Sequence, residues 1–217
     1  MKVILKDIKI ISFDMEGTLI DHTYSKTIWE KDIPKLYAKK NDLDYCEAKR
    51  LVLSEYESVG DSRPEWYDVG YWFNRFGFDG DWRDLAERRS ELVSAYPEVD
   101  GVLTRLSRLF PLIVCSNTIR DFLEVQLRGV GRYFMKVFSA PSDFYTVKKD
   151  NHFYEMVTTQ LDIQPCELVH VGDNYKYDYL AAKELGLKAF YLDRSCQKRG
   201  PGIVCSLEEF EDALENP

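Results

Sequence analysis

Two short stretches decide the fold of this chain: Phe13-Asp14-Met15-Glu16-Gly17-Thr18-Leu19 near its start, and Val171-Gly172-Asp173-Asn174, which Asp178 follows. Each acidic stretch comes directly after a short apolar run, residues 8–13 in the first case and 168–171 in the second. Such runs are typical of buried strands. Because the carboxyl ends of parallel strands meet at one edge of a sheet, we expect the two acidic groups to lie side by side and to hold a cation.

Length and composition are those of a globular chain with a buried core. The sequence has 217 residues, of which 45% are hydrophobic. A net charge of -8 and a pI near 5.0 argue against a nucleic-acid-binding or anionic-membrane surface. The apolar start is interrupted by Lys6 and Asp7, and no window approaches the ~20 apolar residues of a membrane span. We therefore expect neither a signal peptide nor a membrane partner.

The cysteines indicate a reducing compartment. There are five of them, an odd number, at wide spacings and without a Cys-x-x-Cys pair. That pattern is typical of free thiols rather than of a disulfide framework or a zinc site. We expect a cytoplasmic protein.

Strand-like and helix-like patterns alternate over most of the chain. Apolar runs rich in β-branched residues predict five strands, at residues 8–13, 112–115, 136–139, 168–171 and 189–192. Between them, apolar residues recur at the spacing of one helix face, and Ser206 with Glu209 predicts the start of a last helix. This alternation predicts an α/β fold, a doubly wound parallel sheet with helices on both faces.

Residues 20–96 break the alternation. They have a helical pattern, are rich in charge and aromatic residues, and contain all four tryptophans, Trp29, Trp66, Trp72 and Trp82. We expect a helical insert that leaves the carboxyl end of the first strand, where open α/β sheets bind ligands. The predicted domains are a core of residues 1–19 and 97–217 and a helical cap of residues 20–96.

Paired acids at a strand end allow a division of chemical labour. Asp14 is followed by Glu16 and then by Gly17 and Thr18, which predict a tight turn. One carboxylate can attack as a nucleophile while its neighbour serves as general acid and then general base.

At this point the sequence resembles the haloacid dehalogenase-like (HAD) superfamily, most of whose members are magnesium-dependent phosphatases. The resemblance covers essentially the whole chain and implies a Rossmann-like core with an inserted cap. It implies that Asp14 is the nucleophile that forms an aspartyl-phosphate. Glu16 stands where the family's first motif usually has a second Asp, and we expect it to keep the acid and base role.

Two further motifs match less closely. Ser116 and Asn117 resemble the second motif, whose hydroxyl and following backbone amide hold phosphate oxygens, although Ser before a helix is also an ordinary cap. Lys148 lies six residues before Tyr154, the spacing of the third motif, which implies that Lys148 neutralises the nucleophile and the phosphoryl group. By the same spacing, Lys149 belongs to a solvated loop.

Gly172-Asp173 with Asp178 resembles the fourth motif. The resemblance assigns a metal ion to the side chains of Asp14 and Asp173 and to the main-chain carbonyl of Glu16, while Asp178 orients a metal-bound water or Lys148. An acidic site of oxygen ligands suits Mg²⁺ rather than zinc. His170, in a predicted buried strand, is expected to be a hydrogen-bonded core histidine.

These observations predict a magnesium-dependent phosphomonoester hydrolase acting on a small phosphorylated metabolite, with no nucleic-acid partner. Three alternatives stay open: a phosphotransferase or phosphomutase, a dehalogenase that would not need Asp173, and a non-catalytic binding or regulatory protein of the same fold. The sequence does not identify the substrate, because substrate selection depends on residues of the insert. It also does not distinguish a monomer from a homodimer.

Overall fold

The computed structural model describes residues 7–215, so residues 1–6 and 216–217 of the predicted core lie outside the described residues. The described chain forms two compact units. An α/β unit consists of residues 7–21, Ala95–Asn117 and 127–215, and a helical unit consists of His22–Ser94 and Thr118–Gln126. Residues 118–126 therefore group with the helical unit, whereas sequence analysis left them in the core.

The α/β unit is built on a parallel sheet. Within residues 7–215 the sheet has six strands in the order β3-β2-β1-β4-β5-β6. The strands are β1 (Ile10–Phe13), β2 (Leu112–Ser116), β3 (Phe134–Ser139), β4 (Leu168–Gly172), β5 (Lys188–Leu192) and β6 (Ile203–Val204). This order and the parallel pairing confirm the predicted doubly wound α/β fold. The predicted strands correspond to the first five, and the two-residue β6 was not predicted.

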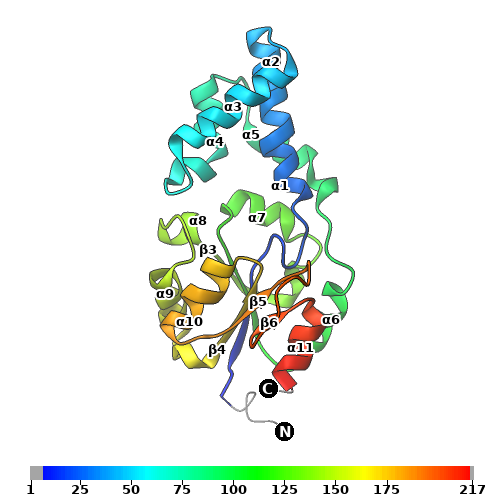
Figure 1. Cartoon of the computed structure of the whole chain (residues 1–217), viewed down its shortest axis with the longest axis vertical. Coiled ribbons are helices and arrows are strands. Elements are labelled where there is room, and N and C mark those ends of the chain that lie inside the picture. Colours follow the sequence, from blue (N-terminus) through cyan, green and yellow to red (C-terminus); the bar gives the residue numbers. More distant parts are fainter. Residues whose placement is uncertain (1–6, 216–217) are drawn as a thin grey trace. The chain divides into compact units, whose positions relative to one another are not determined.

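Helices cover both faces of this sheet. Figure 1 shows α9 and α10 on one side, with α6 and α11 on the other. The helices of the unit are α6 (Val99–Leu106), α8 (Ala140–Phe144), α9 (Asn151–Leu161), α10 (Ala181–Leu185) and α11 (Leu207–Glu215). A π-helical turn, Tyr175–Leu180, precedes α10, and 3₁₀ turns occupy Gly131–Tyr133 and Pro165–Glu167.

The central strands are apolar because both of their faces are covered. Every residue of β1, β2 and β4 is buried. Phe13 packs edge-on against Phe210 of α11, with ring centroids 5.8 Å apart, while Ile113 and Cys115 face the cluster that contains Phe153 of α9. This two-sided burial accounts for the continuous apolar runs in the sequence.

The register of the sheet brings the acidic stretches together. Phe13 is paired with Val114 of β2 on one side and with Val171 of β4 on the other. The Asp14 backbone N–H donates to the Val171 carbonyl over 2.9 Å. Asp14 and Gly172 therefore leave the sheet at the same edge, next to each other.

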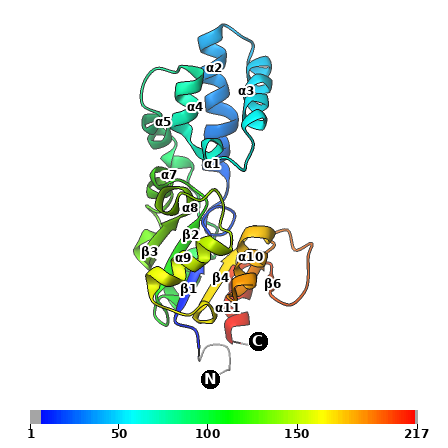
Figure 2. The same cartoon turned by 90° about the vertical axis from the view of Figure 1, so that its left-hand side faces the viewer.

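The helical unit has a core of its own. Its helices are α1 (Thr23–Thr27), α2 (Ile33–Asn41), α3 (Tyr45–Val59), α4 (Val69–Phe76), α5 (Trp82–Arg88) and α7 (Arg120–Gln126), with a π-helical turn at Ile28–Asp32 and 3₁₀ turns at Pro64–Tyr67 and Ser90–Leu92. Figure 2 shows α2 and α3 side by side. Trp72 is fully buried, with its ring centroid 4.6 Å from that of Tyr56. Aromatic packing thus holds this unit together.

The five cysteines, all within the described part of the chain, are free thiols. Among the helices of residues 7–215, none combines the length and the apolar character that crossing a bilayer requires.

Candidate active site

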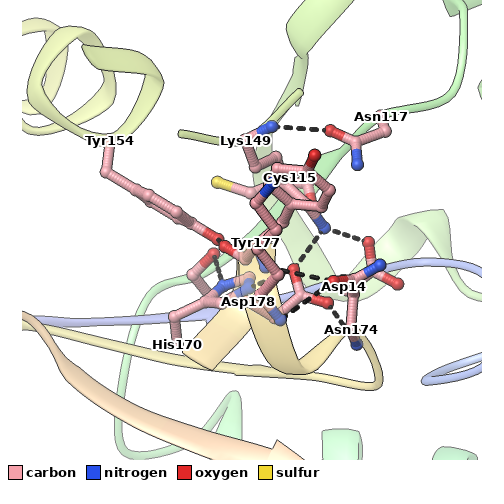
Figure 3. A network of polar contacts seen from close by, with 11 residues as sticks. Asp14, Cys115, Asn117, Lys149, Tyr154, His170, Asn174, Tyr177 and Asp178 are labelled. Atoms are coloured by element: carbon pink, nitrogen blue, oxygen red, sulfur yellow. Dashed lines mark hydrogen bonds and ion pairs between the residues drawn. The ribbon is translucent and has the colours of Figure 1, made fainter. Parts of the chain in front are cut away.

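A buried ammonium group lies between two carboxylates at the carboxyl edge of the sheet. Lys149 Nζ contacts Asp14 Oδ1, lies 2.6 Å from Asp178 Oδ1, and donates to the Cys115 carbonyl over 3.0 Å (Figure 3). Lys149 is only 1% exposed, and Asp178 is fully buried. A buried charge is stable only when it is paired and hydrogen-bonded, and here both conditions hold for the lysine.

The backbone around Lys149 directs its side chain inward. The Lys149 N–H donates to Asn117 Oδ1 over 2.8 Å, which ties this loop to the end of β2. Asp150 then caps α9, because its side chain accepts from the Phe153 N–H over 3.0 Å. The helix therefore begins directly after Lys149, which remains at the edge of the sheet.

The structure places Lys149, and not Lys148, next to Asp14. The Lys148 ammonium lies 5.2 Å from the centroid of the Tyr177 ring, whereas Lys149 contacts Asp14. The prediction that Lys149 lies in a solvated loop was wrong, because its side chain is buried. Asp150, an N-cap residue directly before a helical pattern, was the signal that could have identified Lys149.

Asp178 is held from several sides. Its Oδ2 accepts the Asn174 N–H over 2.9 Å, while its Oδ1 lies 3.0 Å from His170 Nε2 as well as next to Lys149. Asn174 in turn caps the π-helical turn by accepting from the N–H groups of Lys176 and Tyr177. This turn brings Asp178 back over Gly172, the last residue of β4.

His170, on the buried strand β4, is the last member of this network. Its Nδ1 lies 2.9 Å from Ser12 Oγ on the neighbouring strand β1, and its ring packs against Tyr154 with centroids 5.2 Å apart. Burial lowers the pKa of His170, so the ring is neutral. Since the Asp178 carboxylate needs a donor, Nε2 carries the proton and Nδ1 accepts from the Ser12 hydroxyl. His170 is thus a hydrogen-bonded core histidine.

The charges of this network follow from its pairing. Burial disfavours the charged forms of Lys149 and Asp178. Attraction to Asp14 and Asp178 nevertheless raises the pKa of Lys149, and attraction to Lys149 with the hydrogen bond from His170 holds the pKa of Asp178 below its usual range. Burial, together with repulsion from Asp178 and Asp173, raises the pKa of Asp14 to about 8 in spite of Lys149. Asp14 is therefore the member whose charge depends on what binds next to it.

Three carboxylates meet at this edge. Asp14, Asp173 and Asp178 each have an oxygen within 4.8 Å of the others. When all three are ionised, they leave an excess of two negative charges over the single Lys149 ammonium, which a divalent cation would balance. Asp178 accepts from Lys149, from His170 and from the Asn174 N–H, and all three carboxylates offer the oxygen ligands that Mg²⁺ prefers. The residues present therefore fit Mg²⁺.

The remaining predicted site residues lie on the same unit. Ser116 ends β2 and is buried, and the Asn117 side chain holds the Lys149 loop. Glu16 is partly buried in the turn after β1, next to Ile20 in a short backbone bridge. Its carboxylate is not among those that meet within 4.8 Å in the described residues.

Comparison with known proteins identifies the class. The model of the haloacid dehalogenase-like hydrolases matches residues 8–186, which include all four motifs. The chain belongs to this family.

Its relatives include several phosphatases. The chain is 28% identical over 221 residues to a phosphoglycolate phosphatase of Vibrio vulnificus. The match covers 94% of this chain and 92% of that enzyme. It is 30% identical over 74 residues to the GMP/IMP nucleotidase YrfG of Escherichia coli, but this match spans only 34% of the chain and 33% of that protein. The relatives that cover most of the chain thus carry phosphatase names.

Solved structures share the fold. The HAD phosphatase of Thermococcus onnurineus superimposes with a TM-score of 0.82 at 23% identity, over 95% of this chain and 98% of that one. The L-2-haloacid dehalogenase of Xanthobacter autotrophicus superimposes with a TM-score of 0.62 at 19% identity, over 96% and 99%. At these identities the structures establish the fold alone.

The close contact between Gly172 and Asp178 yields a first prediction. A Cβ atom at position 172 would lie 2.3 Å from Asp178 Cγ, so Gly172→Ala must displace the carboxylate from Lys149. We expect Gly172→Ala to lower the free energy of unfolding by about 3 kcal/mol in urea titrations.

Gly129→Ala is the matched control, because a Cβ there would meet no atom within 4 Å. It should change stability by less than about 0.5 kcal/mol. Equal stability of the two variants would contradict the tight packing of Asp178 on Gly172.

Proposed function

We propose that this protein is a magnesium-dependent phosphomonoester hydrolase that acts on a small phosphorylated metabolite through an aspartyl-phosphate on Asp14. The observation that carries the proposal is the buried Lys149 between Asp14 and Asp178, with Asp173 beside them. A nucleophilic carboxylate next to a fixed cation is the arrangement that phosphoryl transfer requires. Membership of the family and the phosphatases among the relatives support the same reading.

In the first step an Asp14 oxygen attacks phosphorus and the bond from phosphorus to the ester oxygen breaks. Glu16 donates its proton to the departing alkoxide. Lys149 contacts Asp14 and offsets negative charge on the attacking carboxylate and on the phosphoryl oxygens. The Ser116 hydroxyl and the Asn117 backbone amide would hold those oxygens at the end of β2.

In the second step Glu16, now a carboxylate, takes a proton from water. The water oxygen attacks the phosphorus of the aspartyl-phosphate, which releases phosphate and regenerates Asp14. The side chains of Asp14 and Asp173 and the carbonyl of Glu16 would hold Mg²⁺, which when bound supplies positive charge to the phosphoryl group. Asp178 keeps Lys149 in place for both steps.

The acid cluster also bears on the alternatives. A dehalogenase would not need Asp173 as a cation ligand, so the meeting of Asp173 with Asp14 favours phosphoryl chemistry. We propose that the helical unit is the cap that selects the substrate, with residues 20–96 as its main segment. The free thiols favour a reducing compartment such as the cytoplasm.

Two substitutions test the chemistry. Asp14→Asn should lower the rate of p-nitrophenyl phosphate hydrolysis in Mg²⁺ by at least about 10³-fold, because the nucleophile is lost.

Glu16→Gln should release a burst of nitrophenol without turnover, since the phosphorylated Asp14 then lacks its base, and mass spectrometry should find the phosphate on Asp14. Asp100→Asn, an exposed residue paired with Arg132, is the control and should retain full activity. Unchanged turnover in Asp14→Asn would refute the proposal.

The two adjacent lysines allow a sharp comparison. We expect Lys149→Met to lower kcat by about 10²-fold or more, because Asp14 and the phosphoryl group lose their cation. Lys148→Met should stay within about threefold of the wild type, since that ammonium lies over Tyr177. Circular dichroism and thermal melts check that both variants are folded. The reverse order of effects would restore Lys148 as the third-motif lysine.

Metal binding should depend on pH. Because burial raises the pKa of Asp14 to about 8, this group is protonated in the metal-free protein below that pH. Mg²⁺ must displace that proton, so its affinity should fall as pH is lowered below 8, approaching about tenfold per pH unit. Isothermal titration calorimetry in buffers of different ionisation enthalpy measures both the affinity and the proton released. An affinity that is constant from pH 6 to 9 would contradict the role of Asp14 as a ligand.

A further inference from the structure

We propose that Arg194 is a positioning residue that clamps the turn after β1 and so fixes Glu16 beside Asp14. No sequence motif pointed to this arginine, which lies in the loop after β5. The inference rests on the proposed function, because it assigns Arg194 a part in the same site.

Arg194 binds the turn through two backbone carbonyls. Its Nε donates to the Gly17 carbonyl over 3.0 Å, and its Nη2 donates to the Thr18 carbonyl over 2.6 Å. The guanidinium is planar and rigid, so two simultaneous bonds fix the orientation of two successive peptide groups. The loop after β5 thereby holds the residues that directly follow Glu16.

The clamp itself is held in place. Nη1 of Arg194 donates to Glu98 Oε1 over 2.7 Å, and the guanidinium carbon lies 3.5 Å from the centroid of the Tyr96 ring. The side chains of Arg194 and Glu98 are only 20% and 13% exposed. Because all three nitrogens donate to protein acceptors and one face is covered by a ring, Arg194 is suited to positioning and not to binding phosphate.

The turn needs an external donor for its carbonyls. Three of its N–H groups bond within the turn: Gly17 donates to the Ile20 carbonyl, and Leu19 and Ile20 donate to the Met15 carbonyl. Gly17 has a positive φ of 79°, and Thr18 is fully buried. Buried carbonyl groups need a hydrogen-bond donor, and Arg194 supplies it to two of them.

Loss of this clamp would act on chemistry more than on substrate binding. Glu16 lies between Asp14 and the clamped residues, so movement of the turn changes both its carboxyl group, the proposed acid and base, and its carbonyl, a proposed Mg²⁺ ligand. A displacement of this kind lowers kcat and weakens Mg²⁺ binding, while the Michaelis constant changes little.

The test compares Arg194→Met and Arg194→Lys with Arg105→Met. Arg105 of α6 makes an ion pair with Glu211 of α11, with Nε 2.8 Å from Oε1, and it serves as the control for losing an arginine-carboxylate pair, although its side chain is more exposed, at 51%. The full-length protein is assayed with p-nitrophenyl phosphate for kcat and KM, and Mg²⁺ affinity is measured separately by calorimetry without substrate. Thermal melts identify any variant that does not fold.

We expect Arg194→Met to lower kcat about 30-fold and Mg²⁺ affinity about tenfold, with KM within about threefold of the wild type. Arg194→Lys should resemble it, because a single ammonium cannot donate to both carbonyls and Glu98 in the same geometry. Arg105→Met should stay within about twofold in all three quantities. If Arg194→Met does not fold, Arg194→Lys carries the comparison.

The proposed role of Arg194 would be refuted if kcat and Mg²⁺ affinity of its variants lay within twofold of those of Arg105→Met. A raised KM at unchanged kcat would also overturn it, by making Arg194 a substrate-binding group. If the wild-type protein hydrolyses no phosphomonoester, the proposed function fails, but calorimetry still decides whether Arg194 supports Mg²⁺ binding.

Discussion

The arrangement of the site depends on one ion pair, the Lys149 ammonium between the carboxylates of Asp14 and Asp178. Breaking a buried pair by removing one partner leaves an uncompensated charge, which costs about 3–5 kcal/mol. The elements that end at this edge of the sheet must therefore hold their positions together. β1 supplies Asp14, the turn after β4 supplies Asp178, and the residue before the α9 cap supplies the lysine.

Much of the surrounding structure serves to hold that ion pair. Asn117 anchors the lysine backbone, the absence of a side chain at Gly172 leaves room for Asp178, and neutral His170 donates to the same carboxylate from the buried strand β4. Arg194 has a similar part at the turn after β1, where it bonds to backbone rather than to a charge. Hydrogen bonds thus hold Lys149, Asp178 and the turn after β1 in place. Asp14, with a pKa raised to about 8, is the group whose charge responds to a bound cation.

The sequence predicted the sheet well because its central strands are buried on both faces. Five apolar runs marked β1 to β5, and the acidic residues after β1 and β4 were correctly expected at one edge, whereas β6 is only two residues long and left no pattern. Lys149 was not identified from the sequence, because the lysine was chosen by its spacing to Tyr154. The position of the Asp150 N-cap is what places Lys149 at the edge of the sheet. Arg194 could not be predicted, since its partners lie 177 and 176 residues away and backbone carbonyls carry no sequence signal. The grouping of residues 118–126 with the helical unit likewise depends on tertiary packing.

We propose that the acidic edge around Lys149 holds a divalent cation next to the Asp14 nucleophile. The most direct test is the anomalous difference density of a crystal grown with Mn²⁺ in place of Mg²⁺. We expect one peak within about 2.3 Å of an oxygen of both Asp14 and Asp173, with Lys149 still bound to Asp14 and Asp178. A saturated crystal without a peak between Asp14 and Asp173, or one in which Lys149 points away from them, would contradict it.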